Sequence, residues 1–276
     1  MLLFDVIALS AYLVFWIFYE RLLPHLVGKR GALNAHMIWI RKQWIWQIAN
    51  RPVRIADGQF IGHTLNSAAF FGSANLIVMA AVIGVMFGGE TAYRSVAGLE
   101  FVQTGNRSLF EIKLMLVVAT LSRGLLDFVW SIRQLNYCLA AIGAMPDHQP
   151  DEQRRAWSEA IGTLINPAMG TFSRGVRGYY FSLAAAAWLL GPVALLLGTV
   201  GAVSLLAWRQ SRSGAADGVR KVWALVAAEE RTSEQDAREQ DAEKPPAPEI
   251  SAPNAASNAA PDAGAGKAAE PGRANP

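Results

Sequence analysis

A stretch of 31 residues without a charge, from Gly178 to Trp208, limits this chain to a membrane protein. Arg177 and Arg209 border it on its two sides. A helix needs roughly 20 apolar residues to cross the hydrocarbon of a bilayer, and helices buried in soluble domains are shorter than this stretch. The composition agrees, because 52% of the 276 residues are hydrophobic and only 17% are charged. We therefore expect an all-α integral membrane protein.

Three other runs also have the length and apolar character of a membrane span. Together with the uncharged stretch they predict four transmembrane helices, over about residues 2–22, 66–89, 110–132 and 179–208. The last is too long for one straight crossing, so we expect it to tilt or to kink at Gly191 and Pro192, where proline removes a backbone hydrogen bond. A hairpin of two short helices is the alternative. It is disfavoured because its halves are short against the roughly 17–25 residues of a typical span.

Two further segments predict amphipathic helices at the membrane surface. Apolar residues recur at helical spacing over about residues 33–50 and 150–166. For the first of these, packing against the spans from the cytoplasmic side is an equally good interpretation. Cations and tryptophans of such helices meet lipid phosphates in the headgroup zone. We expect contacts with the bilayer and its anionic headgroups from Arg41, Lys42, Trp44, Arg174 and Arg177.

The composition changes after the transmembrane domain, which we place at residues 1–210. The remainder, 211–276, forms a tail that contains a single branched aliphatic residue after position 230, Ile250. Such a segment buries too little apolar area to offset the entropy lost on ordering. We therefore expect disorder from about residue 231 onward.

Basic residues set the expected orientation in the membrane. Segments 21–57 and 133–177 hold twelve of them, and the positive-inside rule places these segments in the cytoplasm. With four spans, both termini then lie on the non-cytoplasmic side of what we expect to be a bacterial inner membrane. The four basic residues of segment 209–221 oppose this orientation, because they follow the last span.

The expected span 110–132 carries charges near its middle and belongs to a longer helix that reaches Ala144. At 100° per residue, one side of this helix presents Thr120, Arg123, Asp127, Trp130, Gln134 and Tyr137. We expect this polar stripe to face other helices and Asp127 to neutralise Arg123 one turn away. Asn75, in the second span, also needs a polar partner. The stripe has either a structural role or a functional one, as a polar pathway or a ligand counter-ion.

No motif of known catalytic mechanism is present. The four histidines do not occur at metal-ligand spacing, and the single Cys138 excludes a disulfide framework and a cysteine-based metal cluster. We expect no metal and no cofactor, and we do not expect an enzyme, although one that acts on lipids stays open. The basic residues are scattered beside apolar spans, which favours lipid contact over nucleic acid.

Several stretches together resemble the membrane-protein family known as domain of unknown function 599. They are RKQWIWQIANRPVRIADGQ (41–59), AFFGSANL (69–76), FVWSIRQLNY (128–137) with IGAMP after it, and RGVRGYYFSLAAAAWLLGPV (174–193). The resemblance covers roughly residues 1–210 and implies a multi-pass helical membrane protein without an established activity.

Two functional hypotheses follow. The leading one is a structural or interaction component of the membrane, which contacts lipids and a second copy or another membrane protein. The alternative is an oligomeric small transporter or channel component that uses the polar stripe. Four spans are few for a monomeric transporter, so this alternative requires oligomerisation.

Overall fold

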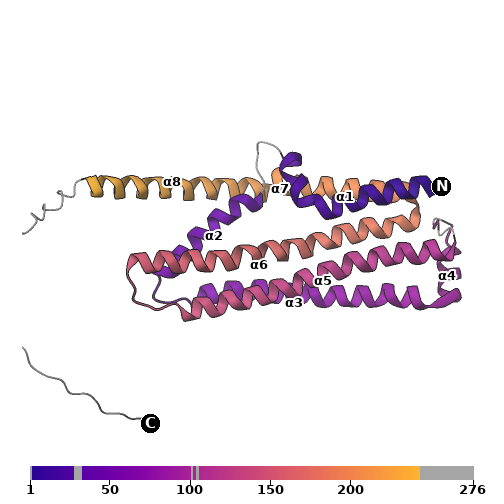
Figure 1. Ribbon diagram of the computed structural model, residues 1–276, viewed down its shortest axis with the longest axis horizontal. Helices are drawn as coiled ribbons and strands as arrows, with labels where there is room; N and C mark the ends of the chain where they lie inside the picture. The colour runs from indigo at the N-terminus through magenta and orange to yellow at the C-terminus, as the bar shows by residue number, and fades with distance from the viewer. Residues whose placement is uncertain (1, 28–32, 101, 104–105, 243–276) are drawn as a thin grey trace, which may run out of the picture. The chain divides into compact units, whose positions relative to one another are not determined.

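The computed structural model describes residues 2–27, 33–100, 102–103 and 106–242, and its regular structure there is entirely helical (Figure 1). The elements are α1 (Leu2–Val27), α2 (Leu33–Asn50), α3 (Ile55–Phe87), α4 (Gly89–Ala97), α5 (Arg107–Ala144), α6 (Asp151–Ala186), η2 (Ala187–Leu190, a 3-10 helix), α7 (Pro192–Ser211) and α8 (Gly214–Ala242). Met1–Thr232 is one compact unit, which holds all of the packing described below, and Ser233–Pro276 is a second. The expected all-α class is confirmed.

Helices α5 and α6 pack against each other at the centre of the first unit. α3 packs on α5, whereas α2 and α7 pack on α6 and α1 packs on α7 (Figure 1). Glycines permit the central contact, because a Cβ added to Gly178 of α6 would lie 3.3 Å from the Cα of Gly124 in α5. The two backbones therefore meet directly, as small residues allow between membrane helices.

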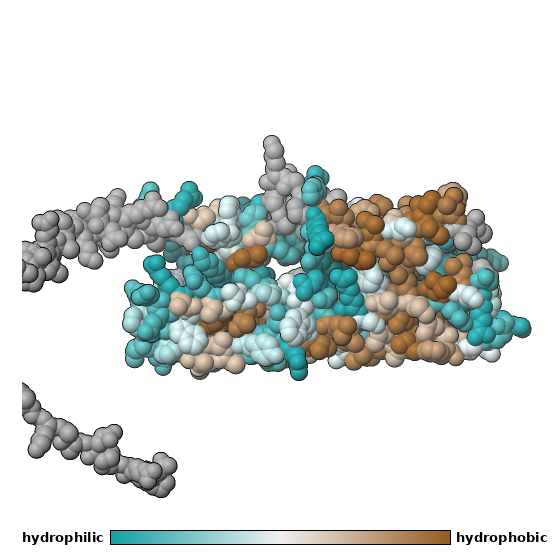
Figure 2. Space-filling model, viewed as in Figure 1, coloured by the Kyte–Doolittle hydropathy of each residue, from teal (hydrophilic) through white to brown (hydrophobic). Residues whose placement is uncertain are grey.

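Two buried hydrophobic clusters stabilise the helices. The first joins α1, α5, α6 and α7 through residues such as Tyr12, Leu121, Phe181 and Leu195. The second joins α2, α3, α5 and α6 and includes the fully buried Cys138. Around the first cluster the outer surface is also hydrophobic, and Figure 2 shows this apolar region beside a hydrophilic band. A continuous exposed apolar surface of this kind indicates contact with lipid.

A buried carboxylate holds the corner between α2 and α3. Asp57 is 1% exposed, and its Oδ1 accepts hydrogen bonds from Trp44 Nε1 at 2.8 Å and from Arg51 Nη1 at 3.0 Å. From the same corner, Arg54 Nη2 donates to the Pro146 carbonyl at 3.0 Å. The corner is thereby tied to the end of α5. Trp44, an expected headgroup contact, is instead bonded within the protein.

Helix α2 has the predicted bounds but packs on α6, so the interpretation as a helix packed on the others describes it better than one lying in the headgroups. Arg41 Nη1 donates to Asn166 Oδ1 at 3.4 Å, and burial lowers the pKa of Arg41 below its usual value. Lys42 is exposed and its ammonium lies 5.3 Å from the centre of the Trp39 ring. Of the three expected headgroup contacts in α2, Lys42 is exposed, whereas Arg41 and Trp44 are partly buried.

The expectation of four membrane spans is wrong. By length and composition, three helical stretches of the described chain can cross a membrane: Leu3–Leu22, Ile55–Phe87 and Pro192–Glu229. The expected span 110–132 is not among them, because Lys113, Arg123 and Asp127 interrupt its apolar character. It lies instead within the 38-residue helix α5.

The expected span 179–208 is divided at its middle. Gly191 has a φ of +120°, a conformation that L side chains rarely adopt, and it separates η2 from α7. Helix α7 then packs back on α6, where a Cβ added to Gly198 would lie 3.2 Å from the Cα of Ala184 (Figure 1). The chain therefore forms the hairpin that seemed too short. The length objection fails because α6 begins at Asp151 and α7 has 20 residues of its own.

Two other boundaries differ from the prediction. The expected surface helix 150–166 is the first part of α6, which continues through Pro167 to Ala186 without ending. The expectation of disorder from about residue 231 is wrong for residues 231–242, which form the end of α8. The rest of that predicted tail, 243–276, lies outside the described residues.

Candidate functional site

A small polar cavity of about 50 Å³ lies between α1, α5 and α6. Its ionisable lining consists of Glu20, Arg123, Asp127, Arg174 and Arg177, together with Tyr19. The volume exceeds the roughly 10–15 Å³ that one water needs but is far below the roughly 300 Å³ at which sites for drug-sized ligands begin. The cavity therefore admits a small polar group rather than a whole organic ligand.

Helix spacing and the glycine contact bring these side chains together. Arg123 and Asp127 lie one turn apart on α5, and Arg174 and Arg177 lie three residues apart on α6, so each pair shares a face of its helix. Both helices approach closely at Gly124, and this places the arginines of α6 beside the carboxylate of α5. The cavity is thus a consequence of the α5–α6 contact.

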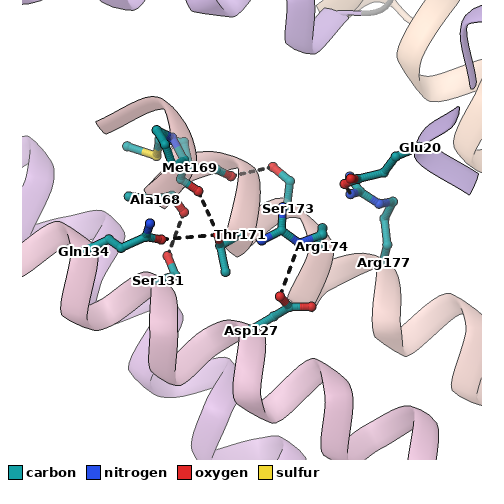
Figure 3. A network of polar contacts seen from close by, with 11 residues as sticks. Glu20, Asp127, Ser131, Gln134, Ala168, Met169, Thr171, Ser173, Arg174 and Arg177 are labelled. Carbon is teal, nitrogen blue, oxygen red and sulfur yellow. Dashed lines mark hydrogen bonds and ion pairs between the residues drawn. The ribbon is translucent and has the colours of Figure 1, made fainter. Parts of the chain in front are cut away.

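Each carboxylate of the cavity pairs with an arginine of α6 (Figure 3). Arg174 Nε donates to Asp127 Oδ1 at 3.2 Å, and Arg177 Nη2 donates to Glu20 Oε1. The expected salt bridge between Arg123 and Asp127 is not the pair that forms. Because α5 and α6 are in backbone contact, Arg174 reaches Asp127 across the helices and replaces the partner on the same helix.

Arg123 is left with an aromatic partner. Its guanidinium carbon lies 5.3 Å from the centre of the Trp16 ring, a cation–π distance, and within the described part of the chain it forms no ion pair. Three guanidinium groups therefore face two carboxylates across the cavity. The cavity walls carry one net positive charge.

Tyr19 adds an unused polar group to this wall. The residue is 2% exposed, and among the described residues its hydroxyl is buried without a hydrogen-bond partner. The Arg177 guanidinium carbon lies 5.6 Å from the centre of its ring. A buried polar atom without a partner costs about 1–3 kcal/mol, which a ligand oxygen in the cavity would recover.

Of the other residues of the predicted stripe, Thr120 lines the cavity and Gln134 lies beyond it, and both are bonded internally. Thr120 is 0% exposed, and its Oγ1 is 2.8 Å from the Tyr12 hydroxyl. Gln134 Oε1 accepts a hydrogen bond from Thr171 Oγ1 at 3.2 Å, two turns along α5 from Asp127 (Figure 3). These side chains join α5 to α1 and α6 rather than face a ligand.

The remaining predicted residues lie outside the cavity. Asn75 Nδ2 donates to the Leu121 carbonyl at 2.8 Å and ties α3 to α5. Trp130 and Tyr137 are 49% and 50% exposed, so the prediction that the whole stripe faces other helices is wrong for these two. Toward the C-terminal half of α5 the stripe turns to the exposed surface, because the neighbouring helices determine which face of α5 is buried.

Sequence reasoning missed the contribution of α1. Trp16, Tyr19 and Glu20 all line the cavity, although the sequence predicted them only as part of the first span, 2–22. The available signal was the position of Glu20 at that end, because a carboxylate at a membrane boundary needs a cation and Arg177 borders the uncharged stretch at a similar depth. The pairing itself, across 157 positions of the sequence, could not be found from local spacing.

A comparison with known protein families identifies the family of this chain. The family model described as "Protein of unknown function, DUF599" matches residues 7–215. The chain belongs to this family. No curated protein and no solved structure matches the chain. The resemblance read from the sequence is confirmed.

All residues that line the cavity lie within the DUF599 region. One of the stretches that carried the resemblance, RGVRGYYFSL, supplies Arg174 and Arg177 together with Gly175 and Gly178 of the helix contact. The stretch around RPVRIADG instead supplies the α2–α3 corner with Asp57. The DUF599 region therefore contains both the hydrogen-bonded α2–α3 corner and the charged cavity.

Proposed function

We propose that this DUF599 protein is a membrane protein that binds an anionic lipid headgroup in the cavity between α1, α5 and α6. The observation that carries the proposal is the excess of one guanidinium over the carboxylates, beside the partnerless hydroxyl of Tyr19. Guanidinium groups bind phosphate oxygens through paired, charge-assisted hydrogen bonds. A phosphate oxygen would also accept a hydrogen bond from the tyrosine.

The position of the cavity along the helices supports a lipid as the source of the phosphate. Glu20 stands near the end of the apolar stretch Leu3–Leu22, and Arg177 borders the uncharged stretch of the hairpin. On the outside of the molecule, a hydrophilic band follows the apolar region (Figure 2). The lipid phosphates of a bilayer lie at this boundary, where arginine side chains reach them.

We infer further that α5 and α6 cross the membrane together with α1, α3 and α7, which gives five crossings. In the apolar region, α5 and α6 expose apolar residues such as Met115 at 58% and Leu183 at 71%. Lys113 of α5 is 1% exposed, and its Nζ donates to the Gln103 carbonyl at 2.6 Å. Charges within membranes face the protein interior in this way, so the polar composition of α5 is compatible with a crossing.

Five crossings change the proposed orientation. The hairpin returns the chain, so the four basic residues of segment 209–221 lie on the same side as the twelve of segments 21–57 and 133–177. The positive-inside rule then places all of them in the cytoplasm, with the N-terminus on the opposite side. This orientation replaces the expectation that both termini are non-cytoplasmic. It also agrees with the basic residues of segment 209–221, which opposed that expectation.

Headgroup binding fits the hypothesis of a structural or interaction component better than the transporter alternative. That alternative depended on a continuous polar stripe along α5. Thr120 is bonded internally and Tyr137 is half exposed, so the stripe does not run as one polar face between helices. A small site for one polar group is the simpler use of these charges.

Thermal unfolding in a neutral detergent tests headgroup binding. We expect short-chain phosphatidylglycerol to raise the melting temperature and short-chain phosphatidylcholine to leave it unchanged. At a free lipid concentration 100 times Kd, binding stabilises a protein by about 2.7 kcal/mol, or about 5–10 °C for a chain of this size. Inorganic phosphate, titrated separately, distinguishes a lipid headgroup from a free anion.

The matched variants are Arg123→Gln and Arg94→Gln. Arg123 forms no ion pair among the described residues and loses only its contact with Trp16 on replacement, so this variant should melt close to the parent in the free state but lose most of the shift. Arg94 is 77% exposed in α4, and its replacement should keep the full shift. Equal shifts in both variants would refute the cavity as the site. A full shift from phosphate alone would show that the ligand is a free anion and not a lipid.

A further inference from the structure

A second and larger cavity lies at the other end of the contact between α1 and α5. Its volume is about 510 Å³, within the roughly 300–1,000 Å³ typical of small-molecule sites. Residues of α1, α5 and the segment just before it, η2 and the start of α7 line it. None of them lines the first cavity, between α1, α5 and α6, which is called the arginine cavity below. The larger cavity is a separate site.

The lining is polar at one end and apolar in its body. Asp5 lies in the first turn of α1, and Asn106 and Ser108 lie at the start of α5. The starts of these two helices lie at the same end of the molecule (Figure 1). Leu9 and Ile112 line the cavity about one turn deeper along their helices. The cavity thus has the polarity of an amphiphile.

Opposite charges balance each other at the polar end. Lys113 directly follows Ile112 on α5, but its buried ammonium reaches back toward this end, where Nζ donates to the Gln103 carbonyl and lies 5.7 Å from the centre of the Trp188 ring. Trp188 Nε1 in turn donates to Asp5 Oδ1 at 2.8 Å. An ammonium has three donors and a carboxylate has two acceptor oxygens, so both groups can also bond a ligand. With no net charge, this end suits a group such as an ester better than a free anion.

We propose that this cavity binds a membrane phospholipid, with one acyl chain in the apolar body and the glycerol ester group at Lys113 and Asp5. The apolar outer surface around the cavity supports a lipid as its occupant. Two lining residues are largely exposed on the apolar outer surface, Val6 at 52% and Ile112 at 50%, and Val193, next to the lining residue Pro192, is 65% exposed. The molecules that meet such a surface in a bilayer are lipid chains.

Photo-crosslinking tests this site in nanodiscs made of phosphatidylcholine with a diazirine on one acyl chain. We expect cross-links to concentrate on the α1 segment 5–9 and the α5 segment 108–113, above the level at exposed residues such as Ile77 of α3. Ile112→Trp places an indole at the cavity and should abolish the cross-links on α1. The control Leu126→Trp, at a 68% exposed position of the same helix, should keep them.

A second variant, Val6→Phe, fills the cavity from α1 and guards against misfolding of the first. The melting temperature of each variant identifies one that does not fold. Loss of the cross-links in a folded variant supports the site. Cross-links on these segments that match the exposed surface of α3, or that persist in both filled variants, would overturn it. The result is independent of the arginine cavity, because the probe lipid is zwitterionic and the variants lie elsewhere.

Discussion

Leucine in place of Gly175 will remove most of the folded protein from the membrane, whereas leucine in place of Gly170 will leave its abundance unchanged. A Cβ added to Gly175 would lie 2.8 Å from Cε1 of Phe128, and two more atoms of that ring would lie within 2.9 Å. The ring is fully buried and stacks on Phe71 with centroids 5.9 Å apart, so moving it disturbs this packing. We expect a loss of about 3 kcal/mol, the upper end of typical overpacking costs.

Gly170 is the matched control, since it lies on the same helix and a Cβ there would meet nothing within 4 Å. Membrane abundance and the melting temperature of the purified variants are the measurements. Alanine at Gly175 should give an intermediate loss, because its Cβ meets the same ring. If Gly175→Leu accumulates and melts like the parent, the contact between α5 and α6 that builds the arginine cavity is wrong.

A cysteine at Ala215 and a cysteine at Glu100 will react from opposite sides of the membrane. In the proposed arrangement of five crossings with the basic segments in the cytoplasm, the loop after α4 faces outward and the start of α8 faces the cytoplasm. The native Cys138 does not interfere, because it is fully buried and burial raises the pKa of its thiol to about 11. In sealed right-side-out vesicles, an impermeant maleimide should label Glu100→Cys at once and Ala215→Cys only after the vesicles are opened.

This labelling separates five crossings from four. A single kinked helix over 179–208 would place both positions on the outer side, and both would then react in sealed vesicles. Asp147→Cys, in the exposed link between α5 and α6, is the control for the cytoplasmic side and should react only in opened vesicles. Immediate labelling of Ala215→Cys would contradict the hairpin as a membrane-crossing unit.

Local features of the sequence predicted the helices but not the turn between α6 and α7. The bounds of α2 and the extent of α5 to Ala144 followed from periodicity and from helix-ending prolines, which are local signals. Gly191 and Pro192 are compatible with a kink and with a turn. The packing of Gly198 on Ala184 decides between them, and this contact depends on the tertiary arrangement.

The sequence predicted the four charged residues of α5 and α6 that line the arginine cavity, but in two unrelated groups. Arg123 and Asp127 were expected as an intramembrane pair, and Arg174 and Arg177 as contacts to lipid headgroups. The structure joins them because Gly124 and Gly178 let two helices meet, which no periodicity within one helix reveals. Tyr19 was missed for the same reason, since packing between helices sets the rotation of α1.

The most direct test of headgroup binding measures contact between a lipid phosphorus and the Tyr19 hydroxyl. Solid-state NMR of protein with ¹³Cζ-labelled tyrosine in phosphatidylglycerol bilayers can detect dephasing of each tyrosine carbon by ³¹P, and Tyr19→Phe assigns the signal. A hydroxyl bonded to a phosphate oxygen has an O–O distance of about 2.5–2.7 Å, so we expect strong dephasing of the Tyr19 carbon that Arg123→Gln weakens. A Tyr19 signal without phosphorus dephasing, in bilayers where surface groups show it, would contradict headgroup binding in this cavity.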